Sequence, residues 1–305
     1  MSDEFNKYIL KNRKDYVALT KIQDKNLGKL YITAAENIKK DADRIVNKLS
    51  FTYAQKQKEI TALLKQADKL TDGFKGLLNK ALVDSANLGT EVNEVILNRY
   101  SQKLAAKGVD VNMKRVLTTA ADDAVKVIYS RIWEDGLKLS DRIWLLNVRT
   151  KREIERIVLE EIASGRPASS KILEARLNKL LNPARRGVMT KLHGRRVLYD
   201  ATRLLRTERA TAFREADRIA SLKNPGLIGI EWHTSGDACA ECNDLVGVYK
   251  PENLPTTPHP NCNCYTTDAA ISSKQFADNW VENMRNPGSH PELDDWYKNV
   301  YRKVA

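Results

Sequence analysis

The sequence predicts a mainly α-helical body, a small α+β lobe built around cysteine and histidine, and a helical tail. Three observations support this fold class. Apolar residues recur at helical spacing through most of residues 1–222, the pattern alternates after Pro225, and all four cysteines lie between Cys239 and Cys264. We expect a helical N-terminal region over 1–139, a domain over 140–270 and a helical tail over 271–305. Within the domain, helices should span 140–222 and the Cys/His β lobe 226–267.

The N-terminal region should contain several amphipathic helices. Leu30, Ile38 and Ile45 fall near helical spacing, with lysines and acids between them. A second helix is expected over 53–70, ended by the Thr-Asp-Gly sequence at 71–73. Two more are expected over 91–106, closed by Gly108, and over 113–133. No internal repeat is visible, so this region is predicted to be a helical scaffold.

Two further helices are expected where the domain begins. Ser140 can cap the first, which should end at Gly165. The second should start at Ser169 or Ser170 and stop before Pro183, with Ile172 and its apolar neighbours facing inward. A short glycine-containing connection favours an antiparallel pair.

The stretch 195–220 predicts a third helix with one apolar face and one arginine face. Glu208 lies nearer the apolar face, where a carboxylate needs a cationic partner, so it is interpreted as a structural clamp. The arginines fit phosphates or acidic residues of a partner protein through their bidentate forks. The arginine strip, expected to face a partner, consists of Arg196, Arg203, Arg206, Arg214 and Arg218.

Beyond Pro225, Ile228, Ile230 and Trp232 alternate with other residues and predict a strand, and 245–249 predicts a second. The tail should be helical from about 272, with Phe276, Trp280 and Met284 inward, and broken at Asn-Pro-Gly over 286–288. Its aromatic end could fold back onto the body or dock a partner, since aromatic residues are enriched at interfaces.

The cysteines and a histidine have the spacing of a metal site. Cys239, Cys242, His259 and Cys262 form C-x2-C-x16-H-x2-C, with Cys264 as an alternate ligand and His233 as a weaker further candidate. The spacing predicts a structural zinc site, because four protein ligands fill a tetrahedral shell. Two alternatives remain. The cysteines could be free buried thiols or form two disulfides, although residues 1–8 show no signal-peptide core.

Charge is distributed unevenly along a chain whose net charge is +12. Residues 1–223 hold 45 Lys and Arg against 28 Asp and Glu, and residues 224–305 hold 6 against 11. A basic body favours a polyanionic partner, most simply the phosphates of double-stranded DNA without sequence preference. A solvated, lysine-rich helical surface is the alternative. No apolar run is long enough for a membrane span, so we expect no membrane partner.

Two motifs carry a resemblance to a known family. The sequence C-x2-C followed by H-P-N-C-x-C, together with the Arg-Thr-Glu triplet at 206–208 in an alanine-rich helix, resembles the Mu F-like phage head morphogenesis family. The resemblance covers about residues 140–267. Asn263 stands where members of the family often carry arginine. The resemblance implies a minor head protein of a tailed bacteriophage, made in the host cytoplasm and held inside the capsid.

Three classes of function are therefore weighed. The first is a minor head protein acting in procapsid assembly and in DNA packaging or ejection, with portal, capsid or scaffolding proteins and DNA as partners. The second is a zinc-stabilised nucleic-acid-binding module unrelated to virions. The third, a metal-dependent hydrolase, needs an open ligand position and a placed carboxylate, for which Asp237, Glu241 and Asp244 are the local candidates. We expect no enzymatic activity.

Overall fold

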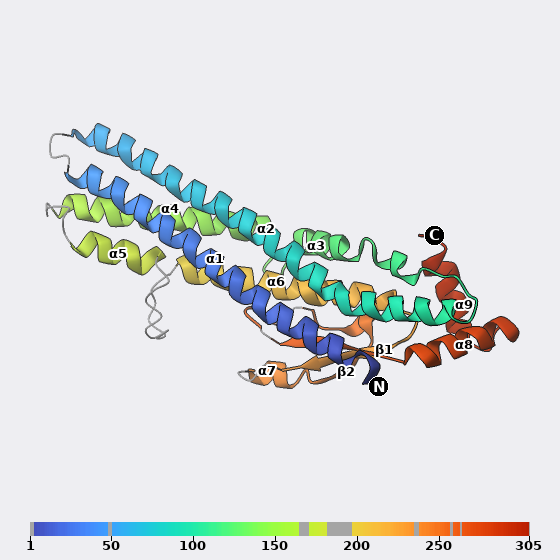
Figure 1. Ribbon diagram of the computed structural model, residues 1–305. Coiled ribbons are helices and arrows are strands. Elements are labelled where there is room, and N and C mark those ends of the chain that lie inside the picture. Colours follow the sequence, from blue (N-terminus) through green and yellow to red (C-terminus); the bar gives the residue numbers. More distant parts are fainter. Residues whose placement is uncertain are drawn as a thin grey trace. The chain divides into compact units, whose positions relative to one another are not determined.

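The computed structural model of the chain is mainly helical, with one small sheet (Figure 1). It describes residues 3–47, 51–164, 171–181, 197–234, 238–256, 259–262 and 264–304. The helices are α1 (Asn6–Asn47), α2 (Tyr53–Ala105), α3 (Ala120–Ser130), α4 (Leu139–Ala163), α5 (Lys171–Leu181), α6 (Val197–Leu222), α7 (Ala240–Asn243), α8 (Ser273–Arg285) and α9 (Pro291–Trp296). The strands are β1 (Leu227–His233), β2 (Gly247–Tyr249) and β3 (Tyr265–Ala270). The predicted fold class is confirmed.

The chain forms two compact units, each assembled from separated segments. Unit 1 contains residues 1–20, 81–129 and 206–305, and unit 2 contains residues 21–80 and 130–205. These units cut across the three regions expected from the sequence, because α1, α2 and α6 each contribute residues to both. Among the described residues, no helix is long and apolar enough to cross a membrane.

The expected break at 71–73 is wrong, since α2 continues through it. Thr71 is buried and its hydroxyl donates to the Ala67 carbonyl (2.9 Å), which satisfies the polar side chain inside a helix. Gly73 lies where a Cβ atom would come 2.8 Å from Leu30 Cδ1. The glycine therefore allows a close approach of α1 instead of ending the helix. Gly108, with φ of 82°, does terminate the run, one turn after Leu104.

Other helix boundaries also differ from expectation. Residues 113–117 form a 3-10 turn before α3. Lys138, not Ser140, caps α4, because the Asp141 side chain accepts the Lys138 backbone N–H (2.9 Å). The α4–α5 pair forms within unit 2, but Ile172 is 41 % exposed and does not face inward. The expected ends at Gly165 and Ser169 or Ser170 lie outside the described residues.

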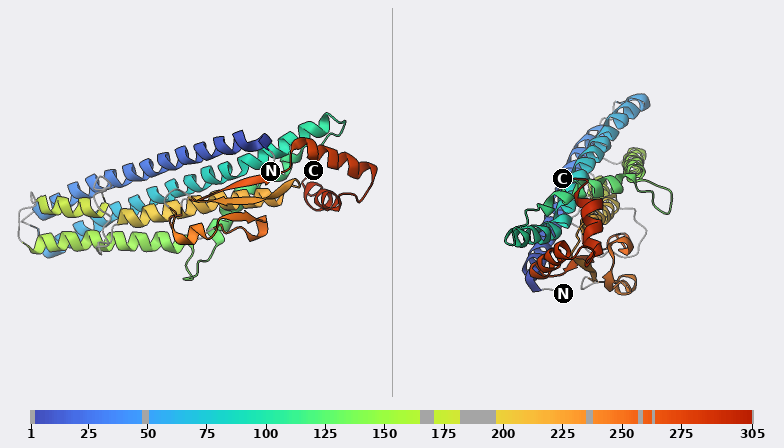
Figure 2. Two further views of the ribbon diagram at one scale, coloured as in Figure 1. Left: turned by 90° about the horizontal axis from the view of Figure 1, so that it is seen from below. Right: turned by 90° about the vertical axis from the view of Figure 1, so that its right-hand side faces the viewer.

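The sheet has strand order β2-β1-β3 and is antiparallel throughout. Ile230 and Trp232 of β1 are fully buried, as the alternation predicts, but Ile228 is 55 % exposed, because an irregularity in the register between Leu227 and Gly229 interrupts the alternation. Strand β3 was not expected, because its sequence Tyr-Thr-Thr-Asp-Ala-Ala lacks the large apolar residues of a typical buried strand. Figures 1 and 2 show the sheet beside the part of α6 that belongs to unit 1.

The tail folds back within unit 1, as one of the two expected alternatives. Phe276 of α8 stacks on Tyr100 of α2, with ring centroids 4.0 Å apart, and Trp280 meets Trp296 edge to face. Met284, expected to face inward, is 62 % exposed. Seventeen buried residues, including these aromatic rings, form the aromatic core of unit 1.

Candidate metal centre

Two short segments of unit 1 carry the candidate metal ligands. Cys239 precedes the single turn of α7, and Cys242 lies in that turn. His259 and Cys262 flank a tight turn in which Asn261 adopts a φ of 65°, a left-handed conformation that asparagine tolerates well. Cys264 directly precedes β3. The two sheet edges and the α7 turn thus bring the predicted ligands into one lobe.

The donor atoms gather around Cys242. Its sulfur lies 2.9 Å from His259 Nε2 and 3.5 Å from Cys262 Sγ, and Cys239 Sγ lies 3.3 Å from the same His259 nitrogen. Two sets of donors each lie within 4.8 Å of one another: Cys239, Cys242 and His259 in one, Cys242, Cys262 and Cys264 in the other. All five side chains named from the sequence therefore meet in one cluster.

These donors suit a metal such as zinc. Tetrahedral zinc with sulfur and imidazole ligands holds its donor atoms about 3.5 to 3.8 Å apart. The separations of 3.3 and 3.5 Å are close to that range and that of 2.9 Å is shorter, and thiolate and imidazole donors are the ones zinc prefers. The cluster could therefore bind a metal ion without a large rearrangement of Cys242 and its neighbours.

The cluster is mostly buried and contains no disulfide. Cys242, Cys262 and Cys264 are 1 %, 2 % and 3 % exposed, Cys239 is exposed, and all four are free thiols. The two disulfides weighed from the sequence are therefore not formed. Burial raises the pKa of the Cys242 thiol well above its usual value and also raises the pKa of the Cys262 thiol. His233 is not part of the cluster, because its Nε2 lies 2.7 Å from Thr267 Oγ1.

Helix α6 holds the ligand segment in place. The Thr207 hydroxyl accepts the Asn261 backbone N–H (2.9 Å). About two turns further along the helix, Arg214 donates through Nε to the Thr256 carbonyl (2.7 Å) and through Nη1 to the Cys264 carbonyl (3.0 Å). The two residues are seven positions apart and so lie on the same helix face. Neither was named as part of the metal site from the sequence, although the i, i+7 spacing of two polar residues inside an alanine-rich helix was a usable signal.

The expected arginine strip does not form one partner-facing surface. Arg214 is 1 % exposed and points into the lobe, so its assignment to that strip is wrong. Arg218 is half-buried and pairs with Glu215 (2.5 Å). Arg206 is half-buried, Arg203 is exposed, and Arg196 lies outside the described residues. The helical wheel failed here because α6 is covered on nearly all sides from Thr207 to Asp217.

The acidic residues considered from the sequence lie in different surroundings. Glu208 is fully buried, as its place on the apolar side of the helix requires, and its role as a clamp stays a prediction. Glu241 and Asp244, two of the carboxylates considered for a hydrolase, are exposed and belong to neither donor set. Asp237, the third, lies outside the described residues.

A buried carboxyl pair lies further along α6 and β3, with Asp268 paired to Ile230 in the sheet. Asp217 and Asp268 are hydrogen-bonded to each other, and Thr266 donates to Asp217 (2.5 Å) while Ser221 donates to Asp268 (2.8 Å). Asn93 of α2 also donates to Asp268 (2.9 Å). Burial raises the pKa of Asp268 to about 6 and raises that of Asp217 well above its usual value. This network ties α2, α6 and β3 together.

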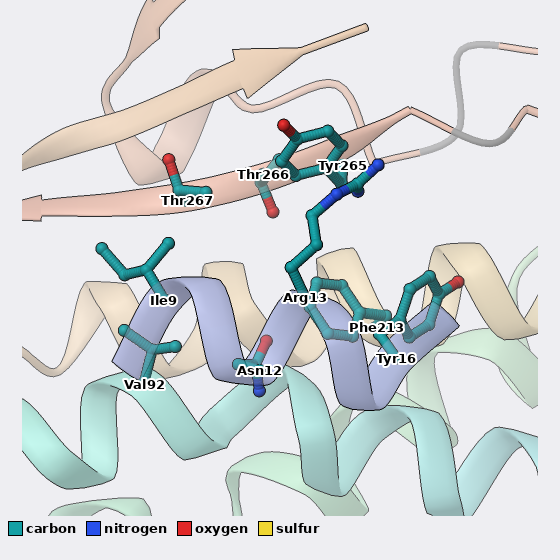
Figure 3. Close-up of a pocket in the computed structure, with 9 residues that line it drawn as sticks. All are labelled: Ile9, Asn12, Arg13, Tyr16, Val92, Phe213, Tyr265, Thr266 and Thr267. Atoms are coloured by element: carbon teal, nitrogen blue, oxygen red, sulfur yellow. The ribbon is translucent and has the colours of Figure 1, made fainter. Parts of the chain in front are cut away.

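One small cavity in unit 1 lies between α1, α6 and β3 (Figure 3). Its volume is about 20 Å³, which is room for about one water molecule. The Arg13 guanidinium lies over the Tyr265 ring, 3.0 Å from its centroid, and the Tyr16 ring packs against Phe213. This cavity is too small for an organic substrate.

Comparisons with known proteins add no relative. The chain matches no protein-family model, no curated protein sequence and no solved structure.

Proposed function

We propose that the Cys/His cluster binds one structural zinc ion through Cys239, Cys242, His259 and Cys262. The observation that carries this proposal is the convergence on Cys242, with His259 Nε2 at 2.9 Å and Cys262 Sγ at 3.5 Å. Cys262 is preferred to Cys264 as the fourth ligand because it completes the H-x2-C spacing with His259 and its sulfur lies 3.5 Å from Cys242 Sγ, while the Cys264 backbone is held by Arg214. Four protein ligands would leave no position for water or substrate, which favours a structural role over catalysis.

The lobe would need such an ion for its stability. Among the residues that the structure describes, its hydrophobic core contains six that are buried: Ile230, Trp232, Cys242, Leu254, Cys262 and Cys264. Three of the six are cysteines, and so little apolar surface gives a weak driving force for folding. A bound metal would cross-link α7 to the segment before β3 and stabilise the lobe directly.

We further propose that the chain is a non-enzymatic assembly protein, specifically a minor head protein of a tailed bacteriophage. This rests on the resemblance of C-x2-C, H-P-N-C-x-C and the Arg-Thr-Glu helix to the Mu F-like family. A physical observation supports reading the motifs together: Thr207 of that triplet is hydrogen-bonded to Asn261 of the H-P-N-C turn. The two motifs would then form one structural unit, in which the helix holds the turn that carries the metal ligands.

Charge supports a polyanionic partner and points to unit 2. Unit 2 holds 30 Lys and Arg against 16 Asp and Glu, a net charge of +14, whereas unit 1 holds 21 against 23, a net charge of −2. Six exposed lysines of unit 2 form no ion pair within the described ranges; they are Lys21, Lys25 and Lys29 on α1, and Lys58, Lys65 and Lys69 on α2. We therefore assign non-specific contact with DNA phosphates to these lysines and no longer to the α6 arginines.

The DNA contact is tested by a charge-matched pair of triple variants. Changing Lys58, Lys65 and Lys69 to glutamine should weaken binding to double-stranded DNA of any sequence. The slope of log affinity against log salt should fall by up to about three, since each lost phosphate contact removes about one unit. The control changes Lys103, Lys114 and Lys126 of unit 1, which removes the same charge. Equal losses in both variants would contradict the assignment to unit 2.

The same assay separates the second candidate function, a zinc-stabilised nucleic-acid-binding module unrelated to virions. A sequence-reading module should prefer some duplexes in a competition of mixed oligonucleotides, because base contacts discriminate and phosphate contacts do not. A minor head protein should show no preference and should co-purify with portal or capsid protein from assembled heads. Sequence preference without such co-purification would replace the first proposal by the second.

A further inference from the structure

Arg214 is a cation placed where a cation is costly. Its side chain is 1 % exposed and lies against Trp232 and Cys262 of the lobe core. Its hydrogen bonds go to two backbone carbonyls, of Thr256 and Cys264. Carbonyls satisfy the N–H groups but carry no net charge. A buried charge without an opposite charge costs several kcal/mol, so a negative group is required nearby.

No carboxylate supplies that charge within the part of the chain that the structure describes. Arg214 makes no ion pair there, whereas its neighbour Arg218, one turn along the same helix, pairs with Glu215. The group that Arg214 does face is the cysteine cluster. Its Nη1 lies 4.0 Å from Cys262 Sγ, and its guanidinium also lies over the Trp232 ring, 5.5 Å from the centroid. The ring offers only a weak electrostatic partner.

We infer that Arg214 balances the negative charge of a metal–thiolate centre and positions its ligand loop. This inference rests on the proposed zinc site. A divalent ion held by three thiolates and one neutral imidazole carries a net charge of −1, which one guanidinium neutralises. Two thiolates with two imidazoles would be neutral and would leave Arg214 without a counter-charge. Arg214 therefore favours a three-cysteine, one-histidine ligand set over a two-and-two set.

The hydrogen bonds of Arg214 give it a second role in the same site, which is to position the segment that carries the ligands. They hold Thr256 and Cys264, which lie on either side of His259 and Cys262 in the sequence. Thr207 holds Asn261 between them. The whole ligand turn is thereby fixed to α6 at three points. Residues that orient metal ligands from outside typically change metal affinity by about 10- to 100-fold when they are replaced.

The test compares three replacements of Arg214 with a matched control in the full-length protein. Zinc affinity is measured by competition with a chromophoric chelator. Arg214→Met, which removes charge and hydrogen bonds, should weaken zinc binding by about 10- to 100-fold. Arg214→Gln keeps hydrogen-bond donors without charge, and Arg214→Lys keeps charge with a different geometry. The lysine variant should stay closest to wild type. The control Arg218→Met should bind zinc within about twofold of wild type, because that side chain faces Glu215.

Cobalt(II) substitution provides a readout besides affinity. The thiolate-to-cobalt charge-transfer band of the wild type should have the intensity of three thiolates. Circular dichroism at saturating zinc shows which variants fold. If Arg214→Met does not fold, the comparison is made with Arg214→Gln and Arg214→Lys. Equal losses in the lysine, glutamine and methionine variants would overturn the charge role, and unchanged affinity in the methionine variant would overturn the inference altogether. Absence of zinc from the wild type is a different result, since it removes the proposed site itself.

Discussion

The two cores of unit 1 are stabilised in different ways. The aromatic core, formed by the end of α2, α8 and α9, contains seventeen buried residues, and its rings contact one another in the pattern Phe5–Tyr100–Phe276–Trp280–Trp296. The lobe core contains six, half of them cysteines. Burial of apolar surface can maintain the first core alone. The second combines too few apolar side chains with five potential metal donors, so its stability should depend on an ion.

Removing the shared ligand should have the largest effect. Cys242 belongs to both donor sets, so Cys242→Ser should abolish stoichiometric zinc and unfold the lobe. Metal analysis and amide hydrogen exchange measure the two effects. Amides of β1 and β3 should lose protection, while those of α8 keep it. Retained zinc in this variant, or equal loss of protection in α8, would show that the two cores do not differ in this way.

Disrupting the aromatic core should have the converse result. Phe276→Ala removes a fully buried ring stacked on Tyr100 and should lower the free energy of unfolding by about 3–5 kcal/mol. Zinc content should stay at the wild-type value, because Phe276 contacts no donor. Denaturant unfolding and metal analysis of the same sample test both statements. A variant that lost its zinc would indicate one cooperative core in place of two.

Two glycines in α2 test whether side-chain packing determines the stability of the helices. A Cβ atom at Gly89 would collide with the Phe213 carbonyl oxygen, whereas one at Gly76 meets nothing within 4 Å. Gly89→Ala should therefore destabilise by about 1–3 kcal/mol. Gly76→Ala should stabilise by about 0.5–1 kcal/mol, because alanine is the better helix former. Thermal unfolding of the two variants should shift in opposite directions, and shifts in the same direction would contradict the packing around Gly89.

The effect of the buried carboxyl pair on stability should appear only when stability is followed as a function of pH. The raised pKa of about 6 for Asp268 means that the folded state holds its proton more tightly than the unfolded state. The resulting stability is complete below about pH 4 and is lost as pH rises through 6. Asp217→Asn removes one of the two charges, so its advantage over wild type should grow from pH 5 to pH 8, by on the order of 1–2 kcal/mol.

Melting temperatures at saturating zinc measure this difference, since comparison at each pH cancels the loss of metal in acid. Asp278→Asn is the control. Hydrogen bonds from Lys107 and Lys274 lower the pKa of the Asp278 carboxyl, so that variant should not gain stability with rising pH. A constant difference between Asp217→Asn and wild type across the range would show that the pair does not titrate with folding.

Local patterns predicted most of the elements and all five candidate metal donors. Spacing was sufficient for the pairs Cys239–Cys242 and His259–Cys262, because ligands within a tight turn are close in sequence. The surroundings were not predictable in this way. The wheel of α6 placed Arg214 on a solvent face, because periodicity shows which residues share a face but not what covers it. Strand β3 was missed for a related reason: Asp268 is buried by partners from α2 and α6 that no local pattern reveals.

The segment order of unit 1 has a consequence for how the chain folds as it is synthesised. Glu4 accepts hydrogen bonds from the backbone and hydroxyl of Ser273, and Tyr100 donates to the Ile271 carbonyl. These partners leave the ribosome long after Glu4 and Tyr100 do. Glu4 and the apolar end of α2 must therefore remain unshielded until residues 271–273 have been synthesised. Contacts between residues so far apart in the sequence slow folding and leave apolar surface exposed to other chains. Synthesis of this protein should therefore benefit from chaperones that cover that end of α2.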